Sequence, residues 1–168
     1  MRTTYTRSAS HAGSWYSSNV NELRRELDGY LDAAAAVVSR DGTITNDGDV
    51  DLRGIIAPHA GYRFSGPTAA YAYSPLAAML CRPDVTRVVV LGPSHHFRLE
   101  GGATTRATLL QTPFGCLAVD IAATSQLRGM PGFIELSPEQ DEEEHSIEVC
   151  VDIDCAFRTP QHGSVWTS

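Results

Sequence analysis

The chain has 168 residues, which favours one domain with a substantial core. Its 13 basic and 20 acidic residues give a formal net charge of -7, which argues against nucleic acid as the main partner. No apolar run approaches the ~20 residues that span a bilayer, and the N-terminus lacks the apolar core of a signal peptide, so we expect no membrane-spanning segment. The cysteines form no C-x-x-C pair, so we expect no disulfide framework and a reduced, cytoplasmic location.

The first predicted element is a helix over residues 19–38. Either Asn19 or Asn21 can cap it, and apolar residues follow at helical spacing, namely Leu23, Leu27, Tyr30 and Leu31. Residues 39–50 are rich in Gly, Asp and Asn, which predicts a surface loop or insert.

The middle of the chain alternates strand and helix signals. RGIIAPHA reads as a short apolar strand that stops at Pro58, and residues 65–80 read as a helix capped by Ser65 and kinked or split at Pro75. TRVVVLGPSHH, from Thr86, is the strongest strand signal. Its valines are continuous, which is typical of a strand covered on both faces.

The last part of the chain predicts an extended hairpin arm over residues 101–115 and a helix over 118–130 with Asp120 near its start. Residues 137–151 predict a further helix, with Ser137 as cap and Pro138 at its first position. This order of elements predicts an α/β fold with a mainly parallel central sheet flanked by helices.

Two predicted strands end alike, in IIAPH and in LGPSH, so His59 and His95 both lie at the carboxyl edge of the expected sheet. Ligand sites of α/β folds gather at that edge. Imidazole is a common ligand of zinc, copper and non-heme iron, so the pair predicts a metal site. A third donor is needed, from His11, His145 or a carboxylate.

Other residues near these motifs have competing interpretations. His96 points away from His95 in an extended backbone, which indicates a supporting or surface position. Trp15 and Tyr16 either pack the N-terminal arm or wall the crevice. A serine hydrolase is disfavoured, because no G-x-S-x-G elbow is present.

In DEEEHSIE, His145 precedes Glu148 by three residues, which places the two on one helical face. Nearby carboxylates favour the protonated form of this histidine. It is a candidate general acid/base or metal ligand, while the alternative is a solvated acidic helix start.

Taken together, ASHAGSWY, IIAPHAGYRFSGPTAAYAY, VVVLGPSHH, TPFG and DEEEHSIEV resemble, in this order, the Memo family (mediator of ErbB-driven cell motility). That family is similar to class III extradiol dioxygenases, which open aromatic rings. The resemblance runs from about Ser8 to Val149.

The resemblance implies a class III extradiol dioxygenase-like fold with a metal crevice in which His59 and His95 are ligands. It implies iron(II) or copper as the metal, with zinc as a further candidate, and a role in redox-linked signalling or cell motility. We assign His145 a catalytic position and expect a further set of residues to contribute to binding, namely His11, Trp15, Tyr16, His96 and Glu148.

Family chains are longer, and their remaining metal ligand, a cysteine, comes from the later half. We therefore divide this chain into the N-terminal part of a Memo-like domain, residues 1–150, and a divergent tail, residues 151–168. Neither Cys150 nor Cys155 takes the place of the family cysteine. A sheet without its later strands exposes an edge and apolar faces, so we expect marginal stability or dependence on a partner.

Three functions follow as expectations. The first is a Memo-like metal-binding protein whose site and catalytic set are incomplete in this chain. The second is a metal-dependent enzyme of the dioxygenase type, and the third is a non-catalytic protein that binds a peptide or a signalling protein in the crevice.

Overall fold

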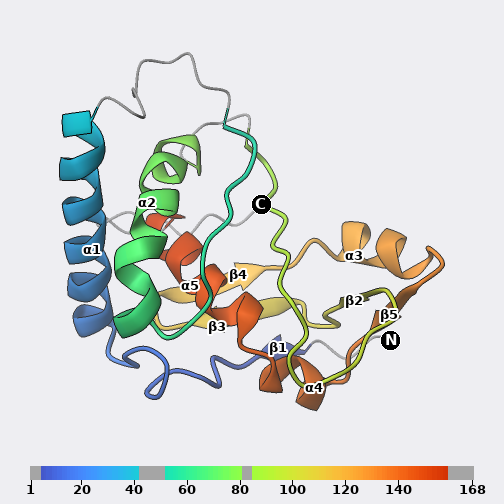
Figure 1. Cartoon of the computed structure of the whole chain (residues 1–168). Helices are drawn as coiled ribbons and strands as arrows, with labels where there is room; N and C mark the ends of the chain where they lie inside the picture. The colour runs from blue at the N-terminus through green and yellow to red at the C-terminus, as the bar shows by residue number, and fades with distance from the viewer. Residues whose placement is uncertain (1–4, 42–51, 81–84, 159–168) are drawn as a thin grey trace.

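The computed structural model of the chain describes residues 5–41, 52–80 and 85–158 (Figure 1). Helix α1, Val20–Asp41, and helix α2, Tyr62–Leu80, pack side by side, and α5, Ser146–Arg158, packs against α2. The predicted insert at 39–50 falls mostly outside the described residues, and α1 extends over its first positions.

Helix α1 confirms the first predicted element. The Asn19 side chain accepts hydrogen bonds from the backbone N–H groups of Asn21 and Glu22, so Asn19 rather than Asn21 is the cap. Helix α2 begins at Tyr62, three residues earlier than predicted, and runs through Pro75 without being split. The cap predicted at Ser65 is wrong, because its hydroxyl lies inside the helix and donates back to the carbonyl of Ala60.

Two small sheets lie beside these helices. Strand β3, Leu109–Thr112, lies between β1, Thr6–Arg7, on its parallel side and β4, Gly115–Ala118, on its antiparallel side. Strand β2, Gly102–Thr104, pairs in parallel with β5, Phe133–Glu135. The predicted hairpin arm is confirmed by β3 and β4, and the predicted helix after it is α3, Ile121–Arg128, capped by Asp120.

The two strands predicted at 53–57 and 86–91 are not strands in this structure. Both segments are extended but irregular, and no backbone–backbone hydrogen bond joins either one to another described residue. The prediction that the valine segment is covered on both faces is also wrong, since Val89 is 76% exposed and Leu91 88%. The apolar pattern is that of a buried strand, but no described strand lies alongside to pair with either segment.

The acidic region forms two helices instead of one. Helix α4, Pro138–Glu143, has the predicted Ser137 cap and a full capping box with Gln140. The chain leaves helical geometry at Glu144 and His145, and α5 starts at Ser146. Helix α5 continues across residue 150, where we placed the start of a divergent tail; that boundary stays a prediction, and residues 159–168 lie outside the described range.

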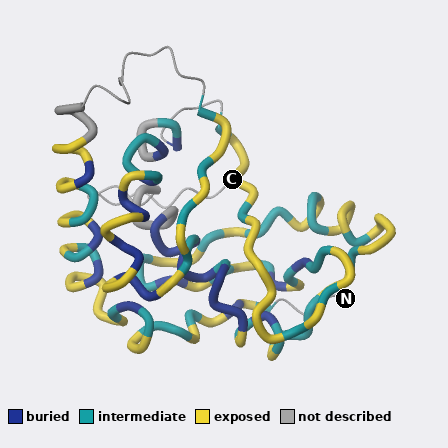
Figure 2. Tube along the Cα trace, in the orientation of Figure 1, coloured by how far each residue is buried: buried dark blue, intermediate teal, exposed yellow. Residues whose placement is uncertain are grey.

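The core lies between α1, α2 and α5, as the dark blue segments of Figure 2 show. It is built mainly from apolar and aromatic side chains, chiefly Leu23, Leu27, Tyr62, Tyr73, Leu76, Val149 and Ile153. The fold is therefore mixed α/β, and the predicted mainly parallel central sheet is absent from the described residues. None of the described helices combines the length and apolar character required to cross a membrane.

Candidate metal centre

Three histidines from distant parts of the sequence meet at one place. His59 ends the extended segment after α1, His95 begins the bend at residues 95–97, and His145 occupies the break between α4 and α5. Each offers a ring nitrogen, and these nitrogens all lie within 4.8 Å of one another. The two predicted ligands are thus brought together, and His145 is the third donor among the alternatives considered.

The spacing of these nitrogens suits a transition metal. The Nε2 atoms of His59 and His95 are 3.3 Å apart. Two nitrogens each bonded at ~2.1 Å to a tetrahedral metal are separated by about 3.4 Å, so this pair already has ligand spacing. The His145 ring stacks on that of His95, with centroids 4.2 Å apart, and one of its nitrogens lies within 4.8 Å of the other two.

Glu144 fixes the orientation of His95. One carboxylate oxygen accepts the His95 backbone N–H at 2.7 Å, and the other lies 2.8 Å from His95 Nδ1 and accepts the Ser146 N–H at 3.0 Å. Burial opposes ionisation of Glu144, but these hydrogen bonds outweigh it and lower its pKa to about 2. An ionised Glu144 holds a proton on His95 Nδ1, which leaves the Nε2 lone pair free toward His59.

His145 is held as a neutral imidazole. Burial, reinforced by the neighbouring His95, lowers its pKa despite Glu144 at 3.7 Å. Glu144 does favour the protonated form, as expected of a nearby carboxylate, but burial and His95 outweigh it, so the net shift of the pKa is opposite to the one expected. The Trp15 ring stacks on the other side of His145, with centroids 4.1 Å apart, so Trp15 forms a wall of the site.

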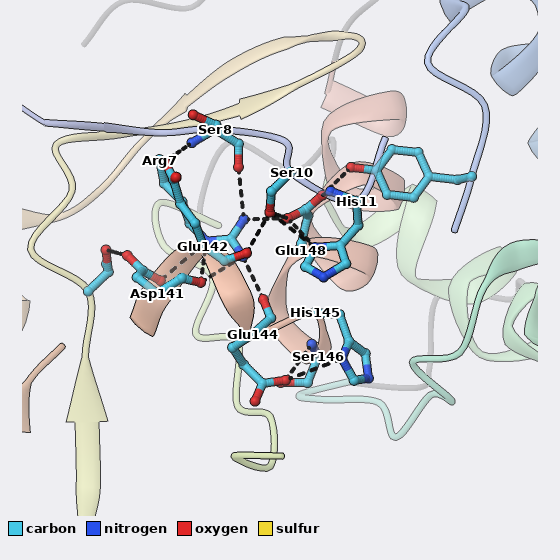
Figure 3. Close-up of polar contacts among 12 residues, drawn as sticks. Arg7, Ser8, Ser10, His11, Asp141, Glu142, Glu144, His145, Ser146 and Glu148 are labelled. Carbon is cyan, nitrogen blue, oxygen red and sulfur yellow. Dashed lines mark hydrogen bonds and ion pairs between the residues drawn. The ribbon is translucent and has the colours of Figure 1, made fainter. Parts of the chain in front are cut away.

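His11 lies beside the cluster and is oriented by Glu148, as Figure 3 shows. The carboxylate of Glu148 accepts the His11 backbone N–H at 2.8 Å and lies 3.0 Å from its Nδ1. Tyr16 donates its hydroxyl to the same carboxylate at 2.6 Å, and its ring is buried in the core. Of the two interpretations for these aromatic residues, wall formation fits Trp15 and packing fits Tyr16.

Arg7 ties this network to α4 (Figure 3). Its guanidinium is almost fully buried, contacts Glu148 at 2.7 Å and Asp141 at 3.2 Å, and donates to the Glu144 carbonyl at 2.6 Å. Five acceptor oxygens, on Ser8, Asp141, Glu144 and Glu148, surround this one cation, which satisfies the buried charge. The N-terminal arm and the α4–α5 junction are thereby joined into one hydrogen-bonded unit.

Sequence reasoning missed two residues of this arrangement, Glu144 and Arg7. Glu144 was grouped with a solvated acidic helix start; the clue to its role is its place next to a histidine at the point where the helix breaks. Arg7 has no local motif that marks it. His96 lies outside the three-histidine group, exposed, with its Nδ1 3.7 Å from Glu143.

Gly92 allows the His95 bend to approach α5. A Cβ atom at this position would lie 2.6 Å from the Ser146 hydroxyl oxygen, and that hydroxyl donates to the Pro93 carbonyl at 2.8 Å. The glycine of the LGPSHH motif is therefore required for close packing of the two chain segments that carry His95 and His145.

These features define a mixed α/β protein with a three-histidine group that can hold a metal ion. The family profile described as Memo-like protein matches residues 7–153, and the chain belongs to the Memo family. It is 42% identical over 145 residues to Protein memo-1 homolog of Caenorhabditis elegans, a match that covers 86% of this chain and 37% of the relative. It is 40% identical to Protein MEMO1 of Xenopus laevis and 36% identical to Protein MEMO1 of Homo sapiens, each covering 85% of this chain and 43% of the relative. The chain thus spans less than half the length of these relatives.

Proposed function

We propose that this chain binds a transition metal ion through His59, His95 and His145. The observation that supports the proposal is the convergence of three imidazoles whose nitrogens lie within 4.8 Å of one another. Glu144 and Trp15 support the same function, since one orients a ligand ring and the other excludes water from a second.

The candidate ions are iron(II) and copper, with zinc as the third. Neutral imidazole suits all of them, and the general order of affinity favours copper(II). A bound iron or copper ion would supply redox chemistry, in keeping with the redox-linked signalling or cell motility that the family resemblance implies. Cytoplasmic location belongs to the same proposal.

Isothermal titration of the full chain with iron(II), copper(II) and zinc tests the proposal. We expect about one equivalent of at least one ion to bind, and we expect the double variant His59→Ala/His95→Ala to lose that binding. The matched control is His96→Ala, which removes an exposed imidazole next to the site and should bind like the wild type. Equal binding by the double variant would remove the basis for this function.

A second candidate is a metal-dependent enzyme of the dioxygenase type. Three protein donors leave coordination positions open for a substrate, which is the arrangement that such enzymes need. In that case His11 is placed to exchange protons beside the site, with its Nδ1 held by Glu148. Oxygen consumption with catechols in the iron-loaded protein is the test, and consumption equal to that of the His59→Ala/His95→Ala variant argues against it.

A further inference from the structure

The break between α4 and α5 has no glycine or proline to cause it. Residues 142–146 read EEEHS, and glutamate is a good helix former, so the sequence predicts one helix across this position. The backbone nevertheless becomes extended at Glu144, with φ −82° and ψ 123°. Sharp changes of direction in a helix have identifiable causes, and here the cause lies in the side-chain contacts made at the break.

Arg7 takes the place of two helical hydrogen-bond donors at this break. In a continuous helix the carbonyls of Asp141 and Glu144 would accept from the N–H groups of residues 145 and 148. Neither backbone bond occurs between these described residues. The Arg7 guanidinium instead donates to the Asp141 carbonyl at 2.9 Å and to the Glu144 carbonyl at 2.6 Å (Figure 3). Arg7 therefore satisfies carbonyls that the end of α4 leaves without helical partners.

The capping guanidinium is itself fixed from outside α4. Arg7 lies on β1, where it is opposite Leu110 of β3, and it is 3% exposed. The carboxylates of Asp141 and Glu148 pair with its charge at 3.2 and 2.7 Å. The position of the break is thus tied to the β1–β3 pair.

The break determines where two residues of the candidate metal centre lie. The carboxylate of Glu144 accepts the His95 backbone N–H and contacts the His95 ring. The next residue, His145, lies between the rings of Trp15 and His95, with centroids 4.1 and 4.2 Å away. If α4 continued into α5 as one helix, the directions of both the Glu144 and the His145 side chain would change.

We propose that Arg7 is a positioning residue of the metal centre, because its cap on α4 holds the break that places Glu144 and His145 at the site. The effect of Arg7 on metal binding rests on the proposed function, whereas its effect on the break does not. Arginine is required in this role, since its planar group donates to carbonyls and carboxylates in several directions at once. A lysine ammonium has three donors on a single atom and cannot reproduce that pattern.

Nuclear magnetic resonance of the full chain in EDTA tests the effect on the break without metal. The variant is Arg7→Lys, which keeps a positive charge beside Asp141 and Glu148. We expect the Cα chemical shift of Glu144 to be that of extended backbone in the wild type and to move toward the helical value in the variant. An unchanged shift would overturn the proposal. Loss of the folded circular dichroism signal in Arg7→Lys would also overturn it, in favour of a role in fold stability alone.

Titration with zinc tests the consequence for the site. We expect Arg7→Lys to bind zinc ~10-fold or more weakly than the wild type. The matched control is Asp141→Asn, which removes a carboxylate that pairs with Arg7 but leaves both backbone carbonyls in place, and it should bind zinc like the wild type. Cobalt(II) absorbs visible light most strongly in tetrahedral sites, so the cobalt spectrum of Arg7→Lys should be weakened while that of Asp141→Asn is retained.

Equal zinc affinity of Arg7→Lys and the wild type, or an equal loss in Asp141→Asn, would overturn the positioning role. A wild-type chain that binds no ion, but whose Glu144 shift responds to Arg7→Lys, would remove the metal-binding function while supporting the role of Arg7 at the break. The two failures are therefore distinguishable.

Discussion

Asp152 gives the sharpest stability prediction of the described structure. It lies on α5, is fully buried, and neither carboxylate oxygen has a hydrogen-bond partner among the described residues. Tyr16 is near, but its single hydroxyl hydrogen is donated to Glu148. Burial, opposed by Tyr16 and reinforced by the negative charge of Glu148, raises the pKa of Asp152 to about 8.

The sign of the effect follows from proton binding. Between the ordinary pKa of 3.8 and the folded pKa of about 8, Asp152 is protonated in the folded chain and ionised in the unfolded chain. The free energy of unfolding therefore falls as pH rises through this window, by ~1.4 kcal/mol per pH unit. At pH 7 the accumulated loss is about 4 kcal/mol.

The test is Asp152→Asn, compared with the wild type by urea unfolding at pH 5, 6, 7 and 8, followed by far-ultraviolet circular dichroism. Groups distant from Asp152 contribute equally to both proteins, so the pH dependence of the difference in unfolding free energy reports on Asp152 and its neighbours Tyr16 and Glu148. We expect the stability advantage of the variant to grow by ~1.4 kcal/mol per pH unit up to about pH 8. Asp28→Asn, at an exposed position on α1, is the matched control for the loss of a carboxylate. A difference between Asp152→Asn and wild type that does not change with pH would refute the reasoning.

Two further predictions concern the residues that brace the site. Glu144→Gln removes the charge that holds the proton on His95 Nδ1, so we expect the metal affinity measured by isothermal titration to fall ~10–100-fold. An unchanged affinity would contradict the role of Glu144 in orienting His95. Arg7→Met leaves the carboxylates of Asp141 and Glu148 without their buried cation, so we expect the free energy of unfolding, measured in urea, to fall by ~3–5 kcal/mol. Arg25→Met, on the exposed side of α1, is the control and should change it little. Equal losses in the two variants would show that the Arg7 network does not stabilise the fold.

Local chemistry made the helices predictable. Asn19, Asp120 and Ser137 are good caps that precede helical sequences, and each performs that function in the structure. The spacing of Leu23 and Leu27 likewise identified the face of α1 that is buried. These signals lie within a few residues of one another, so they can be recognised without knowledge of the rest of the fold.

The extended segments were harder to predict because a strand depends on its neighbours. The segment around Val88 and Val89 has the composition of a buried strand, yet both side chains are exposed. Their exposure depends on which part of the chain packs beside them, and local composition does not contain this information. The proximity of His59 and His95 was nevertheless correctly anticipated, although the sheet edge from which it was predicted is absent from the described residues, because it required only that the two segments end close together. Glu144 and Arg7 were missed, since their partners are more than forty residues away along the chain.

The candidate site has two parts, one around His145 and one around His59 and His95, and the two are supported differently. His145 is fixed by Trp15 and by the helix break, and the Arg7 network joins that break to the N-terminal arm. His59 and His95 instead end the two segments that have no backbone pairing among the described residues. Glu144 and Ser146 link the two parts, because Glu144 accepts from the His95 backbone N–H and contacts its ring, and the Ser146 hydroxyl donates to the Pro93 carbonyl. The position of His95 relative to His145 therefore depends on Glu144 and Ser146, which join the two parts of the site.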